Sequence, residues 1–210
     1  MVSTKNFADR PKVGGRPSLD FINTEGGVRN GPPDWLESYE DVVEWSASEG
    51  LLSVEEATDL LAKASRNPEA ANKVFDRAIE LREGLFRVFH SIRDDREPAR
   101  QDLAVFDREL SSALARLKLT PSENRFEWRF VGGECELDRV LWPIVRDAAD
   151  VLSSDVIERV EECDGDSCTW LFVDTSRNHS RRWCKMGDCG NRAKARRYYQ
   201  RHKRGTGTTP

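Results

Sequence analysis

Residues 163–189, CDGDSCTWLFVDTSRNHSRRWCKMGDC, hold four of the five cysteines of this 210-residue chain. The four form two pairs, Cys163 with Cys168 and Cys184 with Cys189, and four residues separate the members of each pair. Each pair bends the chain into a short knuckle whose sulfurs face one point, and the segment between the pairs brings the two points together. Four soft ligands without a vacant position favour one closed, structural Zn²⁺ site.

Other uses of these cysteines stay open at this stage. Four thiolates also suit an iron–sulfur cluster, and cysteines that bind no metal are the third alternative. His179 lies five residues before Cys184 and is a substitute ligand, although four cysteines already complete a tetrahedral shell. The fifth cysteine, Cys135, is expected to be a small buried apolar residue of a strand.

A strongly basic segment follows the second cysteine pair. Residues 161–210 contain 11 Lys and Arg against 6 Asp and Glu, a net charge of +5, and because the whole chain carries −4, residues 1–160 carry −9. Residues 191–203 contain no Pro or Gly and predict a helix, with Cys189 in its first turn. Like charges along a helix repel one another unless a polyanion neutralises them. The predicted nucleic-acid contacts are Arg177, Asn178, Arg181, Arg182, Asn191, Arg192, Lys194, Arg196, Arg197, Arg201 and Lys203.

The basic segment also has a plainer interpretation. The helix is then a solvated one that packs Tyr198 or Tyr199 on the rest of the protein. The side-chain amides of Asn178 and Asn191 then serve backbone groups of the turns around the metal.

The first 158 residues are dominated by helical patterns. Apolar residues recur at helical spacing in 35–46, behind the capping-box pair Ser53 and Glu56, and in 69–93, 100–118 and 138–153. Pro143 falls in the second turn of the last segment and tightens or shifts the helix start. Because any packed helix needs an apolar face, these stripes indicate core faces rather than cofactor sites.

One segment has the period of a strand. In residues 125–137, Phe126, Trp128 and Phe130 alternate with charged residues, and Gly132-Gly133 predicts a hairpin turn. The sequence thus predicts an α+β fold. A mainly helical N-terminal domain with a β-hairpin spans 1–158, a small treble-clef-like zinc finger spans 159–204, and a disordered tail spans 205–210.

Composition argues against several classes of protein. No apolar stretch approaches the ~20 residues of a membrane span, and the first residues lack the apolar core of a signal peptide, so we expect a cytoplasmic protein without a membrane partner. Three histidines and the absence of a nucleophile elbow, a phosphate loop or an open metal site argue against an enzyme. The glycine-rich loop that follows Leu19–Thr24 indicates a flexible turn, or else the border of a small-molecule pocket.

The C-terminal segment closely resembles the CGNR zinc finger, named for Cys189-Gly190-Asn191-Arg192. The resemblance covers residues ~160–203 and includes both cysteine pairs. The preceding part is similar to the ABATE domain through LDFINT at 19–24, VVEWSASEGLLS at 42–53 and IELREGLFRVF at 79–89. The resemblance implies a bacterial, stress-linked transcription regulator that binds DNA through its finger. The acidic linker DGDS at 164–167 departs from what a nucleic-acid surface favours.

These observations predict a DNA-binding transcription regulator that uses a Cys₄ zinc finger with a basic helix. An RNA-binding module and a protein-interaction module with the same structural zinc are the alternatives. The N-terminal domain would sense a small-molecule ligand or form a homodimer, because one small finger reads few bases and palindromic sites favour two-fold proteins.

Overall fold

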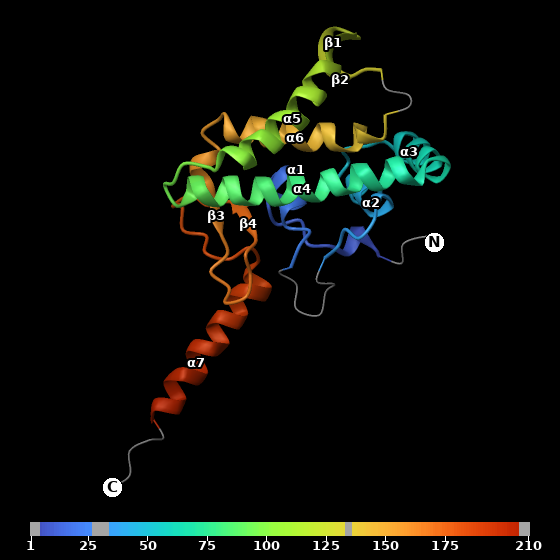
Figure 1. Ribbon diagram of the computed structural model, residues 1–210. Coiled ribbons are helices and arrows are strands. Elements are labelled where there is room, and N and C mark those ends of the chain that lie inside the picture. Colours follow the sequence, from blue (N-terminus) through green and yellow to red (C-terminus); the bar gives the residue numbers. More distant parts are fainter. Residues whose placement is uncertain (1–4, 27–33, 133–135, 206–210) are drawn as a thin grey trace.

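The computed structural model describes residues 5–26, 34–132 and 136–205, and it confirms the α+β class (Figure 1). Helices form most of the body, and each of the two small sheets pairs two antiparallel strands. The α-helices are α1 (Pro17–Ile22), α2 (Tyr39–Ser48), α3 (Val54–Arg66), α4 (Pro68–Arg93), α5 (Arg100–Arg116), α6 (Trp142–Leu152) and α7 (Asn191–Gly205). The strands are β1 (Leu117–Ser122), β2 (Arg125–Phe130), β3 (Val160–Glu162) and β4 (Leu171–Val173), and the short helical turns are η1 (Phe7–Asp9), η2 (Leu137–Leu141), η3 (Ile157–Arg159) and η4 (Met186–Gly190).

The long helix α4 organises the main core. Its start is fixed by Asn67, whose side chain accepts a hydrogen bond from the Ala70 N–H, and by Pro68 in the first turn. Its buried face includes Leu81 and Leu85, and α1, α2 and α5 pack around the helix. The capping box predicted from Ser53 and Glu56 is present at the start of α3, and both of its reciprocal hydrogen bonds form.

The β1–β2 hairpin differs from the prediction in its partner strand and its turn. Helix α5 ends at Arg116, and the next residues form β1, which pairs with β2 so that Leu119 lies opposite Trp128. The turn is Glu123-Asn124 rather than Gly132-Gly133, and Gly132, with a φ of 78°, lies after β2. Leu117 extends the apolar helical stripe in the sequence, which conceals the alternation of Leu117 and Leu119 with polar residues. Cys135 and its predicted strand lie outside the described residues.

Pro143 shifts a helix start, as expected. The helix predicted over 138–153 is divided into η2 and α6, and Pro143 occupies the first turn of α6, where a missing N–H costs nothing. Apart from the undescribed segments, no helix is long and apolar enough to cross a membrane.

The finger is built into the main core rather than attached beside it. Strand β4 carries Leu171 and Val173 into the same apolar cluster as α1 and α4, and β3 pairs with it so that Val160 lies opposite Val173. The backbone N–H of Val173 also donates to the Gly14 carbonyl at 2.9 Å. A segment just before α1 therefore lies against the outer edge of the finger's strand.

One asparagine side chain extends this connection. The amide of Asn23, at the end of α1, donates to the Leu171 carbonyl and accepts from the Leu171 N–H, each at 2.8 Å. Asn23 is buried, so both of its amide groups find partners where water cannot serve them. The side chain thus takes the place that the backbone of a neighbouring strand would take.

Candidate metal centre and nucleic-acid interface

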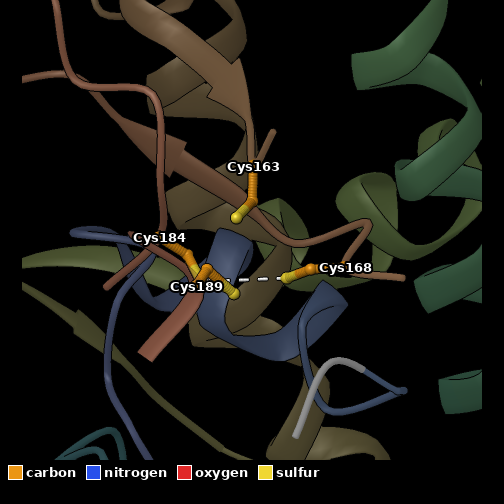
Figure 2. Close-up of side chains that lie close together, drawn as sticks. All are labelled: Cys163, Cys168, Cys184 and Cys189. Carbon is orange, nitrogen blue, oxygen red and sulfur yellow. Dashed lines mark hydrogen bonds between the residues drawn. The ribbon is translucent and has the colours of Figure 1, made fainter. Parts of the chain in front are cut away.

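The four predicted cysteine ligands meet at one point. Their sulfur atoms lie within 4.8 Å of one another, and the four side chains are 1–4% exposed. Figure 2 shows the side chains converging, with Cys163 and Cys168 on one side of the cluster and Cys184 and Cys189 on the other. Cys163 follows β3 and Cys168 precedes β4, while Cys189 lies in η4, just before α7 rather than in its predicted first turn.

The spacing of the sulfurs fits zinc. A Zn–S bond of about 2.3 Å in a tetrahedron places the sulfurs about 3.8 Å apart. The Cys184 sulfur lies 3.7 Å from the sulfurs of both Cys168 and Cys189. The four cysteines therefore fit one structural zinc ion with a complete ligand shell.

The thiols also need a cation to ionise together. Hydrogen bonds from the thiols of Cys168 and Cys184 lower the pKa of Cys163 to about 2, so one thiolate is favoured in the bare cluster. That thiolate in turn raises the pKa of Cys168 to about 12 and raises the pKa of Cys184 as well. Zinc supplies the positive charge that lets all four sulfurs lose their protons.

The loop around the four cysteines is tightly packed at Gly165. A Cβ there would lie 3.1 Å from the Cys189 sulfur and 3.4 Å from the Cys163 sulfur. Arg192 approaches the same cluster from α7, and its Nη2 donates to the Cys189 sulfur at 2.8 Å. This bond ties the first turn of α7 to the metal centre.

Arg181, a predicted nucleic-acid contact, has its guanidinium engaged inside the protein. It donates to the carbonyls of Trp183, Val173, Val13 and Cys184 at 3.1, 3.3, 3.1 and 2.5 Å. The guanidinium carbon also lies 4.1 Å from the centroid of the Phe172 ring. Arg181 therefore joins the finger's loop, its core and the segment before α1.

Arg181→Lys is expected to lower the free energy of unfolding by about 3 kcal/mol, because an ammonium cannot reach carbonyls that a planar fork reaches together. Urea unfolding in excess zinc measures the change. Arg177→Lys, at an exposed position of the same loop, is the control and should change stability by less than about 0.5 kcal/mol. Equal stability of the two variants would contradict the structural role of Arg181.

Three more predicted contacts are paired with acidic residues. Arg182 pairs with Asp164 at 2.5 Å, Arg196 pairs with Asp166, and Arg192 lies 3.4 Å from Asp188. The acidic linker that departs from the expected charge pattern therefore neutralises part of the basic surface.

The remaining cations face solvent. Arg177, Lys194, Arg197 and Arg201 are exposed, and within the described ranges none of them forms an ion pair. Arg197 lies with its guanidinium 5.8 Å from the Trp183 ring. Figure 1 shows α7 extending away from the body, and its main packing partner is η4. These four residues are named the exposed basic set.

The remaining predicted contacts differ in whether their side chains have partners within the protein. Asn191 donates to the Gly187 carbonyl at 3.1 Å, so its amide serves the turn before α7, whereas Asn178 is exposed. The side chain of Lys203 lies outside the described residues. Tyr198 and Tyr199 are 59% and 71% exposed, so they do not pack on the body.

Sequence reasoning missed Asn23 and Trp170, which connect the finger to the helices. Trp170 is buried in one cluster with the four cysteines, and its indole N–H donates to the Glu25 carbonyl at 3.1 Å. Asn23 and Leu171 are 148 residues apart in the chain. No local pattern marks such a pair, although a polar residue that follows the apolar cluster of α1 is a weak signal.

Comparisons with known families agree with this arrangement. Residues 15–155 match the ABATE family model, described as "Putative stress-induced transcription regulator", and residues 159–202 match the CGNR zinc finger. A search of curated proteins returned no match. Both matched models are of regulatory and zinc-finger types rather than enzyme families. Since the first match spans more than half of the chain, the chain belongs to the ABATE family and carries a CGNR zinc finger after the ABATE segment.

Proposed function

We propose that the chain is a transcription regulator that binds duplex DNA through α7 and the adjoining loop. The observation that carries the proposal is the exposed basic set, which has no carboxylate partner among the described residues. Lys194, Arg197 and Arg201 lie on a helix directed away from the body, and Arg177 lies in the adjoining loop. Phosphates supply the missing counter-charge, and the zinc cluster holds the base of the helix rigid. We propose that the protein works in the cytoplasm and catalyses no reaction.

Binding of a fluorescent duplex in rising salt tests this function. About four phosphate contacts by the exposed basic set give a log–log slope of roughly −4 for the binding constant against salt. Fluorescence anisotropy measures the slope, and selection from random duplexes should enrich a motif. A flat salt dependence would contradict an electrostatic interface.

Competitors separate the other two candidate functions. If structured RNA displaces the duplex at lower concentration than unlabelled duplex does, the finger is an RNA-binding module. If neither nucleic acid binds, the basic helix is a surface for an acidic protein. Homodimerisation also stays a prediction, which sedimentation of the chain with and without a palindromic duplex tests.

Asp166→Asn is expected to tighten DNA binding several-fold, because it releases Arg196 for a phosphate and adds about 0.9 to the magnitude of the salt slope. The matched control is Asp59→Asn on α3. The two aspartates have side chains that are 61% and 60% exposed, and each pairs with one cation. Anisotropy titrations at two salt concentrations measure the change, and equal effects of the two substitutions would show that only net charge matters.

A further inference from the structure

A cavity lies where the end of α1, the middle of α4 and the finger meet. It encloses about 210 Å³, below the ~300–1,000 Å³ typical of sites for drug-sized ligands, so a ligand must be compact. The cavity, named the junction cavity, is lined by Ile22, Asn23, Glu25, Gly26, Arg82, Glu83, Phe86, Arg87, Thr169 and Trp170.

The apolar wall of the junction cavity consists of Ile22, Phe86 and Trp170. Trp170 and Ile22 are 3% exposed, so their positions are fixed by the surrounding core. Two flat rings and one branched aliphatic side chain suit a ligand with a flat apolar part.

The two arginines of the wall are already paired with other carboxylates. Arg82 donates to both oxygens of Asp34 at 2.7 and 2.6 Å, and Arg87 donates to Asp102 through Nε and Nη2 at 2.9 and 2.8 Å. Asp34 and Asp102 do not line the cavity. The guanidinium charges are therefore neutralised from outside.

The two glutamates of the wall lack such close partners. Among the described residues, the nearest cationic nitrogen lies 3.9 Å from the Glu25 carboxylate and 3.7 Å from the Glu83 carboxylate. Both distances exceed a hydrogen bond, so two carboxylates are left to accept hydrogen bonds from a ligand. Because Asp34 and Asp102 already neutralise Arg82 and Arg87, the carboxylates of Glu25 and Glu83 leave the wall with a negative charge that favours a cation.

We propose that the junction cavity binds a compact aromatic amine. The ring lies against Phe86 and Trp170, and the ammonium group meets Glu25 and Glu83. Residues of both matched segments line the site. Trp170, from the zinc-finger segment, is two residues from the zinc ligand Cys168. This binding site is independent of the DNA-binding proposal.

Three probes that share a phenyl ring and a hydroxyl group test the charge requirement. They are 2-amino-1-phenylethanol, 1-phenylethanol and mandelate, which carry an ammonium, no charge and a carboxylate. Each is titrated into the full zinc-loaded chain without DNA, by calorimetry and by the Trp170 indole N–H signal in NMR spectra. We expect saturable binding and a Trp170 shift with the amine alone. Binding of mandelate or 1-phenylethanol as tight as that of the amine, or no binding by the amine, would overturn the proposal.

Two matched substitutions on α4 test whether the amine binds in the junction cavity. Glu83→Gln is expected to weaken binding of 2-amino-1-phenylethanol about fivefold, the upper range for a partly exposed ion pair. Glu80→Gln is the control, because Glu80 pairs with Arg108 outside the cavity, and the two side chains are 51% and 49% exposed. Equal weakening by both substitutions would overturn the assignment. A chain that binds the amine but no DNA keeps this site and loses the function proposed above.

Discussion

Cys184→Ser is expected to abolish zinc binding and to lower the melting temperature of the whole chain by more than about 10 °C. Apparent binding energies of structural zinc are about 10–16 kcal/mol, comparable with the whole net stability of a domain at about 5–15 kcal/mol. A chain of this size loses about 2–4 °C per kcal/mol. The effect extends to the helices because Leu171 and Val173 belong to the main core. Thermal melting followed by circular dichroism, with zinc content from elemental analysis, measures it.

The control is Cys135→Ser, because the other four cysteines alone complete the cluster seen among the described residues. It should leave one zinc per chain. Adding a chelator to the unmodified chain should reproduce the Cys184→Ser result, and returning zinc should reverse it. An unchanged melting temperature after complete zinc removal would contradict the coupling of the finger to the core.

Combined replacement of Lys194, Arg197 and Arg201 by alanine is expected to weaken duplex binding about 10²-fold or more at about 0.1 M salt. It should also reduce the magnitude of the salt slope by about 3. The three side chains are exposed on α7, so their loss removes phosphate contacts without opening a cavity in the core. Anisotropy titration of one duplex at several salt concentrations measures both quantities.

A variant with the same change in charge is the control. Lys118, Arg125 and Arg129 lie on the β1–β2 hairpin, which Figure 1 places at the opposite end of the molecule from α7. Their combined replacement by alanine should leave the slope unchanged. If this control weakens binding as much as the α7 variant does, the protein attracts DNA through its overall charge and α7 is not the interface.

The metal site was predictable from the sequence because its chemistry is local. Four identical ligand types at two equal spacings have few alternative uses, and Cys163, Cys168, Cys184 and Cys189 lie together as expected. The helices α3 and α4 were predictable for a related reason, since Ser53 and Asn67 cap them from adjacent positions.

Features that depend on distant partners were not predictable in the same way. The strand that pairs with β2 was concealed because Leu117 fits a helical and a strand period equally well. Arg181 and Arg197 look alike in the sequence, yet one is held by four carbonyls and the other is exposed. Charge alone cannot separate such residues, because the carbonyls around Arg181 come from segments that meet only in the folded chain.

The isolation of α7 has a consequence for how such a regulator changes over generations. The helix rests on η4, and from Arg197 to His202 its side chains are exposed. Substitutions there alter what the helix touches while the core, the zinc cluster and the Asn23 connection remain intact. A few mutations in this part of α7 can therefore change what the helix binds, and the protein needs no additional stability to tolerate these mutations.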